Sequence, residues 1–348
     1  MHETTKVILI LVVSVVCTSQ PGSLLAWGDS LHVDPTGGSD DNQGTEDKPL
    51  RTLYRAAVIV NQSGKAAPGT IRLAPGIYNL DRPVVFQNTG VYTKDNRLTI
   101  SAQHQPDDPG WKPSLMPTIL STESPKISGT YSIKVNMSHV SISGLRFLGN
   151  PSLGNYHAVI TRTGVGHRDL LIAQCVFIGD KNGLDINCPV IGIGDELIVD
   201  HCVFLNCHAS AVFWDGFNGT VGKGNAMRYC IIYGGHIAGV WTCQTSEDFV
   251  FRNNVVANCK FAWMRKPGDR QKYTMRNCVV TNCHALSGYG RESGPFRRTG
   301  ENVRFVRDNV IEDGEVSLEQ NRNAQNYFQL EKGSLGSDLG AGLFAKPQ

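Results

Sequence analysis

A six-residue pattern that recurs seven times between residues 142 and 311 constrains the fold more than any other feature. In each copy the first and sixth residues are apolar, and the fourth is Cys, Asn or Leu. The copies are 142–147, 172–177, 199–204, 227–232, 251–256, 275–280 and 306–311, spaced 24 to 31 residues apart. A period of this length is typical of repeat proteins, in which one supersecondary unit stacks on the next.

An apolar residue, a bend three residues later and an apolar residue two further on describe two short strands meeting at a corner. We call the fourth position the bend column: Leu145, Cys175, Cys202, Cys230, Asn254, Cys278 and Asn309. A small side chain there is expected to lie inside the turn and stack on its copies. Asn would do so by amide hydrogen bonding, and Cys as a small apolar residue. Five residues later, Cys207, Cys259 and Cys283 form a second column.

This repeat pattern resembles that of the right-handed parallel β-helix superfamily, which includes pectate lyases and many glycoside hydrolases. The resemblance covers residues 98–315 and is specific for fold but not for function. It predicts an all-β chain, a right-handed parallel β-helix (solenoid) with an N-terminal capping helix. The 37 glycines and the low charged fraction of 18% also suit many short strands joined by tight turns.

Residues 1–26 are predicted to be a signal peptide. Lys6 precedes an apolar run over 7–16, and small residues follow as far as Ala26. The run is shorter than a transmembrane span of about 20 residues, so the mature chain is expected to lack one. Lipidation at Cys17 is the alternative. Either way the chain is expected to be secreted, periplasmic or attached to the cell surface.

Segments on either side of the repeats are predicted to close the solenoid. Residues 27–97 resemble the opening module of secreted β-helix proteins, a strand and capping helix before the first coil. Leu50, Leu53, Tyr54, Ala57 and Val58 are expected to form the apolar face of that helix. Residues 316–348 lose the repeat and are expected to be an irregular segment packing along or over the last coil.

The strands that follow each repeat form a candidate ligand-binding sheet. They are 156–163, 183–190, 210–217, 237–245, 260–267 and 285–292. Aromatic side chains stack on the apolar C–H faces of sugar rings. The predicted substrate-binding residues are His157, Trp214, Trp241, Trp263 and Tyr289. The alternative is that the three tryptophans point inward and fill the core.

Charge is segregated along the chain. Residues 169–220 carry seven acidic side chains and one basic, whereas 260–310 carry eleven basic and four acidic. This segregation suits a groove for an anionic polysaccharide, unless the charges lie on solvated turns. The net charge of +2 excludes little by itself.

Two kinds of catalysis remain open. In a lyase, Arg265, Lys266 and Arg291 would act as base and clamp, while Asp185 and Asp215 would hold Ca²⁺. In a glycoside hydrolase, one of Asp185 and Asp215 would be the acid and the other the base or nucleophile, and Glu292 is a further candidate for the acid. The competing hypothesis is a noncatalytic glycan-binding or surface-structural protein.

Histidines recur directly after the second column at 208, 236 and 284, with Lys260 at the same place in the intervening coil. A stacked polar ladder is expected there in preference to zinc, because the cysteines recur as repeat columns and lack Cys-x-x-Cys spacing. No nucleotide-binding glycine loop or Ser-His-Asp signature stands in a convincing context, and nucleic acid is not an expected partner. The sequence predicts no particular oligomeric state.

Overall fold

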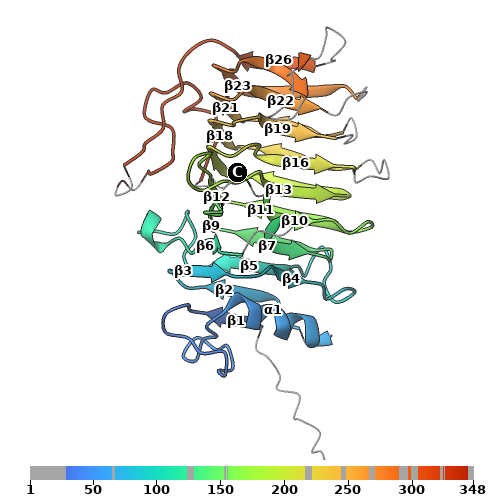
Figure 1. Ribbon diagram of the computed structural model, residues 1–348, viewed down its shortest axis with the longest axis vertical. Coiled ribbons are helices and arrows are strands. Elements are labelled where there is room, and N and C mark those ends of the chain that lie inside the picture. The colour runs from blue at the N-terminus through green and yellow to red at the C-terminus, as the bar shows by residue number, and fades with distance from the viewer. Residues whose placement is uncertain are drawn as a thin grey trace, which may run out of the picture.

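The protein is a right-handed parallel β-helix in the computed structural model, with its coils stacked along one long axis (Figure 1). The structure describes residues 29–343 except 65–66, 124–128, 153, 155, 216–221, 244–247, 266–270, 290–296, 299–304, 322–323 and 325. The predicted signal peptide therefore lies outside the described residues. No helix in the described ranges has the length and apolar character needed to cross a membrane.

Each coil contributes strands to three faces, and the strands within each face run parallel to one another. The first face contains β1 (Ser30–Val33), β2 (Thr70–Leu73), β5 (Leu98–Ala102), β8 (Val140–Ser143), β11 (Arg168–Ala173), β14 (Asp195–Asp200), β17 (Ala226–Arg228) and β20 (Val250–Arg252). The second contains β3 (Ile77–Leu80), β6 (Thr118–Ser121), β9 (Arg146–Leu148), β12 (Val176–Ile178), β15 (Val203–Leu205), β18 (Ile231–Tyr233) and β21 (Val255–Ala257). The long strands β23 (Tyr273–Thr281) and β26 (Phe305–Ile311) continue from the first face to the second.

The third face contains β4 (Val84–Phe86), β7 (Thr130–Val135), β10 (His157–Arg162), β13 (Cys188–Ile193), β16 (Ala211–Trp214), β19 (Ala238–Thr242), β22 (Phe261–Arg265) and β24 (Ala285–Tyr289). β25 (Arg297–Arg298) pairs with β24 in the antiparallel direction. A 3-10 helix over Pro113–Leu115 precedes β6.

Two predicted apolar columns form the core. Ile142, Ile172 and Val199 are paired in register across three coils, and all three are buried. Phe147 and Phe177 stack with ring centroids 4.9 Å apart, and Phe177 stacks on the next ring at the same distance. The first six repeats keep the predicted alignment.

The seventh repeat was aligned one residue too early. The sequence pattern matched Val306 to Met275, but the structure pairs Met275 with Arg307. The reason is a left-handed residue that stands directly before the bend column in each of the seven repeats. Asn277 and Asn309 both hold this position, with φ 49° and 56°, and their side chains are hydrogen-bonded at 2.9 Å. Asn309 therefore marks the corner itself, and the bend residue after it is Val310.

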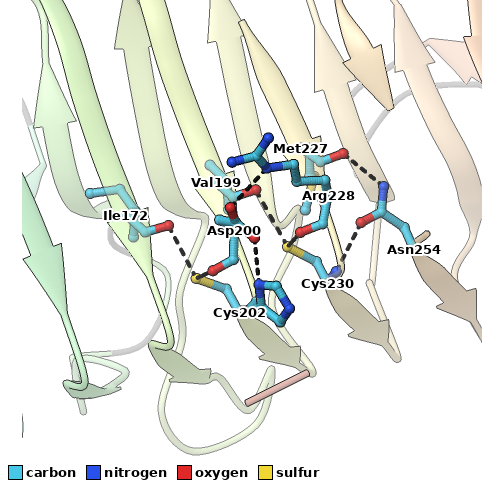
Figure 2. A network of polar contacts seen from close by, with 9 residues as sticks. Ile172, Val199, Asp200, Cys202, Met227, Arg228, Cys230 and Asn254 are labelled. Carbon is cyan, nitrogen blue, oxygen red and sulfur yellow. Dashed lines mark hydrogen bonds and ion pairs between the residues drawn. The ribbon is translucent and has the colours of Figure 1, made fainter. Parts of the chain in front are cut away.

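The bend column joins successive coils by side-chain hydrogen bonds (Figure 2). Asn254 accepts from the backbone N–H of Cys230 and donates to the carbonyl of Met227, both at 2.9 Å. The thiols of Cys202 and Cys230 contact the equivalent carbonyls one coil earlier, at 3.6 and 3.7 Å. The expectation that Cys acts there as a small apolar residue was therefore incomplete, because its thiol contacts the same carbonyl of the preceding coil as the Asn amide does.

Helix α1 (Leu53–Gln62) lies at the N-terminal end of the solenoid beside β1 and β4 (Figure 1). The hydroxyl of Thr52 caps it by accepting from the N–H of Arg55 at 3.1 Å. Its buried residues are Leu53, Ala56, Ala57, Ile59 and Val60. Val58, which was expected on the apolar face, is 39% exposed, since the helical period places 53, 56, 57 and 60 on one side.

The C-terminal segment runs back along the outside of the second face (Figure 1). Its apolar residues join a separate cluster with outward-pointing valines and an isoleucine of β12, β15, β18, β21 and β23. The members from this segment are Val316, Leu318, Tyr327, Phe328, Leu330, Leu335, Leu339, Ala341 and Leu343. The second face is thereby covered along several coils, whereas this cluster does not reach the third face.

Replacing Asn254 tests the bend column. Asn254→Ala leaves the buried N–H of Cys230 and the carbonyl of Met227 without partners, and should lower the free energy of unfolding by about 2–4 kcal/mol. Asn254→Cys restores the residue usual in the column and should cost less than about 1.5 kcal/mol. Urea denaturation followed by tryptophan fluorescence measures both. The exposed control Asn79→Ala should change stability by less than about 0.5 kcal/mol. Equal losses for the two Asn254 variants would contradict the proposed equivalence of Asn and Cys.

Candidate functional site

The outer surface of the third face carries its own apolar cluster. Along adjacent strands, Val190, Ala211 and Val240 lie in register and belong to the main core. Their chain neighbours Val212 and Trp241, also in register, belong to a different cluster. Because successive side chains of a strand point to opposite faces, this second cluster lies on the outside of the solenoid.

We call this outer cluster the aromatic platform. It is formed by Tyr131, Ala158, Cys188, Ile191, Val212, Trp214, Trp241 and Cys243. The small residues are buried, while the rings of Tyr131, Trp214 and Trp241 are partly exposed. The ammonium of Lys134 lies 4.1 Å from the centroid of the Tyr131 ring. The platform therefore offers aromatic surface and one positive charge to solvent, on a rigid parallel sheet.

A polar cluster lies at the edge where the third-face strands begin. Nε2 of His208 lies 3.1 Å from Oδ1 of Asp185, and its Nδ1 lies 3.1 Å from the side-chain amide of Asn187. Nε2 of His157 lies 3.2 Å from the hydroxyl of Ser132, and its Nδ1 lies 3.2 Å from the carbonyl of Asp185. Since both nitrogens of each ring have partners, these imidazoles hold the cluster together.

Burial sets the charge state of His157. The pKa of this histidine is lowered, chiefly because the folded protein takes its ring out of water. The nearby carboxylates of Asp185 and Glu123 act in the opposite direction. The ring is fully enclosed, so it does not reach a ligand on the surface as the sequence analysis expected of a substrate-binding residue.

Glu123 is the member of this cluster that the sequence did not reveal. Its carboxylate accepts the backbone N–H of Tyr131 at 3.3 Å, and its carbonyl accepts the side-chain amide of Asn150 at 3.1 Å. Asn150 in turn exchanges two backbone hydrogen bonds with Asp185. Glu123 comes before the third-face strand of its coil and outside the aligned repeats, so no pattern pointed to it.

The residues predicted to form a polar ladder occupy equivalent places in successive coils beside the second column. The backbone N–H groups of His236, Lys260 and His284 each donate to the preceding coil at equivalent positions, at 2.9, 3.0 and 3.1 Å. The rings of His208 and His236 meet edge to face at 5.9 Å. Over the described part of the chain, no group of three His, Cys, Asp or Glu side chains has a metal-binding arrangement.

The two predicted catalytic aspartates are far apart. Asp185 lies beside His208 before the third-face strands, whereas Asp215 follows the last residue of β16. Six residues lie between positions 208 and 215, four of them in β16, so the two carboxylates lie roughly 15 Å or more apart along the sheet. Acid and base of a glycosidase need to be within about 10 Å, and a shared Ca²⁺ would need direct contact with both. The two residues therefore do not fit a common cation site.

The other predicted residues are scattered. Arg265 ends β22 and is buried, with its guanidinium 5.2 Å from the Tyr273 ring and donating to the carbonyl of Gln271. Trp263 is 0% exposed, and its indole donates to Thr242 at 2.8 Å inside the coil. Lys266, Arg291 and Glu292 lie outside the described residues, as does the side chain of Tyr289.

Two carboxylates of the acidic half are paired at different places on the solenoid. Asp169 is bound by Arg97 at 2.6 Å and by His139 at 2.8 Å. Asp200 is bound by Arg228 at 2.8 Å, on the first face of the solenoid. These carboxylates are neutralised locally at different corners.

Comparisons with known proteins agree with this architecture. The model of the family described as "Right handed beta helix region" matches residues 131–310. No curated protein matches the chain. A rhamnogalacturonan lyase structure is 15% identical, with 76% of this chain and 70% of that chain covered and a TM-score of 0.45. The pectin methylesterase PemA from Erwinia chrysanthemi is 11% identical, with 91% and 98% covered and a TM-score of 0.41. At these values the likenesses carry no statement about what this chain binds.

The pKa of His157 predicts a pH dependence of stability. The unfolded chain takes up this proton near the usual pKa of about 6.5, before the buried ring does. The contribution of the neutral, buried His157 ring to the free energy of unfolding is therefore complete above about pH 6.5, and it is lost as the pH falls through the lowered pKa of the folded protein. In His157→Gln the free energy of unfolding should fall less steeply between pH 7 and 5, by up to about 1.4 kcal/mol per pH unit. The exposed control His284→Gln should keep the wild-type slope, and an unchanged slope in His157→Gln would contradict the assignment.

Proposed function

The chain belongs to the right-handed β-helix family, and on that premise we propose that it is an exported carbohydrate-active protein that binds a polysaccharide on its aromatic platform. Support for export comes from the basic residue and apolar run over residues 6–16. Support for the ligand class comes from the partly exposed rings of Tyr131, Trp214 and Trp241, which gather on the third face.

The rings of the platform are held in fixed positions. Trp214 and Trp241 come from adjacent strands, and they pack on the buried side chains of Val212 and Cys243. Neighbouring strands lie about 4.8 Å apart, so Trp214 and Trp241 present rings from adjacent coils, and Tyr131 adds a third ring three strands away from Trp214. A polymer of sugar units can lay the C–H faces of several units on such a surface with little loss of side-chain entropy. The platform is the single observation that carries the proposal.

Lys134 favours an acidic polysaccharide. Its ammonium lies over the Tyr131 ring, where it can pair with a sugar carboxylate while the ring stacks on the sugar. Lys260 adds a second positive charge to the ladder at the edge of the same face. We therefore propose uronate-containing chains as the ligand class.

Replacing the platform tryptophans tests binding. Trp214→Ala and Trp241→Ala should each weaken binding to an acidic polysaccharide by about 10-fold, corresponding to about 1.4 kcal/mol for a stacked ring. Affinity electrophoresis in gels containing polygalacturonate, or calorimetry with oligosaccharides, measures the effect. The aromatic control Tyr229→Asn changes a ring stacked on His201 on another face and keeps a residue suited to its left-handed backbone. Equal affinity for both tryptophan variants and the control would contradict the platform as the binding surface.

Cleavage of the bound chain is the second candidate function. The observation in its favour is that two carboxylates, Asp185 and Glu123, lie near His157 at the edge of the platform. A pair of carboxylates is the usual equipment of glycoside hydrolysis, and a carboxylate can also remove a proton in a lyase. The binding function does not depend on it.

A polysaccharide panel separates cleavage from binding. A lyase raises the absorbance of unsaturated ends, whereas a hydrolase releases reducing ends without that signal. If the chain cleaves, Asp185→Asn and Glu123→Gln should lower the rate at least about 100-fold while binding persists. Asp107→Asn, an exposed carboxylate away from the cluster, should keep the full rate. Absence of both signals over a broad panel would leave the noncatalytic binding function.

A further inference from the structure

A cavity of about 550 Å³ lies at the corner where the third-face strands end and the first-face strands begin. It is bounded by the turns after β4, β7, β10 and β13. The lining residues used below are Ser138, His139, Val165, His167, Gly194 and Asp195. This corner is at the opposite end of the strands from the Asp185 and His208 cluster, so it does not belong to the site already described.

Arg162 is a buried cation beside this cavity with an incomplete set of partners. It is the last residue of β10 and is 0% exposed. Its Nε donates to the carbonyl of Ile193 at 3.0 Å, but neither terminal nitrogen has a hydrogen-bond partner among the residues that the structure describes. Burial lowers the pKa of Arg162 to about 10, so the guanidinium is still charged at neutral pH.

The charge of Arg162 faces the wall of the cavity. Gly194 lines the cavity and has no side chain. A Cβ atom placed on it would lie 3.9 Å from a terminal nitrogen of Arg162, so the guanidinium lies close behind this glycine. The pKa of His167 on the same wall is lowered, first by burial and then by the positive charge of Arg162. Asp195, Asp169 and Glu196 attract this charge from a distance. A buried guanidinium behind a thin wall raises the electrostatic potential in the space beyond it.

The carboxylates around this corner already have partners. Asp169 is bound by Arg97 and His139 at 2.6 and 2.8 Å. Asp195 accepts the backbone N–H of Lys223 at 2.8 Å. Glu196 lies 3.6 Å from the ammonium of Lys94. Arg162 forms no ion pair with any carboxylate in the described part of the chain, and the exposed Arg168 adds a further positive charge to the lining.

We propose that this cavity is a binding site for an oxyanion, a carboxylate or sulfate group, held over Gly194 and beside His167 with Arg162 behind the wall. The anion adds negative charge next to Arg162, beyond the distant attraction of Asp195, Asp169 and Glu196. Such a group could be a free inorganic anion or an acidic substituent of a sugar. The site is separate from the platform, so it stands or falls independently of the proposed polysaccharide binding.

Val165 provides a test that leaves the core untouched, because it lines the cavity and is 63% exposed. Calorimetric titrations with sodium sulfate and with galacturonate, at constant ionic strength set by sodium chloride, should each be compared for the wild type, Val165→Glu and Val165→Gln. The added carboxylate of Val165→Glu should weaken anion binding by about fivefold or more, while the matched amide should stay within about twofold. Tighter binding of sulfate would indicate a free inorganic anion as the ligand, and tighter binding of galacturonate would indicate an acidic sugar substituent.

Arg162→Met should abolish the binding of both probes, and circular dichroism shows whether this core variant folds. If it does not fold, the comparison of Val165→Glu with Val165→Gln decides alone. The proposal is overturned if the wild type shows no saturable binding of either anion, or if the glutamate and glutamine variants bind equally well. An unchanged affinity in a folded Arg162→Met protein would overturn it too.

Discussion

The hydrogen bonds of the bend column are the interaction on which the rest of the structure depends. A left-handed residue turns the chain at each corner between the first and second faces, and the residue after it must satisfy backbone groups that the turn removes from the ladder. Asn254 does so with its amide, and Cys202 and Cys230 do so with their thiols. Since each side chain bonds the preceding coil, the column fixes which residues lie above one another as well as where the chain bends.

That register decides where function can reside. With the coils locked, the third face brings Tyr131, Trp214 and Trp241 from three distant parts of the chain to one exposed surface. The second face is covered by the C-terminal segment. Polar groups gather at the two ends of the third-face strands, with Asp185 at one end and Arg162 at the other. The rigid sheet thus separates a stacking surface from two different polar edges.

The fold could be predicted from the sequence because every stacked coil needs apolar residues at the same inward positions. The apolar columns that contain Ile142 and Phe147 show this requirement directly. The prediction failed at Val306, where an asparagine of the left-handed position resembled one of the bend column. The site was harder to predict. Whether a side chain on a strand points into the core or outward depends on the residue at which the chain turns each corner, and the sequence does not mark that residue on the third face. Trp263 and Trp241 look alike in sequence, yet one fills the core and the other lies outside. Asp185 and Asp215 share one kind of strand but lie at its opposite ends, and no pattern marked Glu123.

Amide hydrogen exchange at the bend column tests the account most directly. The N–H of Cys230 is bonded to the side-chain oxygen of Asn254 at 2.9 Å. This corner amide should therefore exchange as slowly as the strand amide of Val203, which is bonded to the carbonyl of Cys175 at 2.9 Å. If it exchanges as fast as the amides of exposed turns, the column does not tie the coils together and the account is wrong.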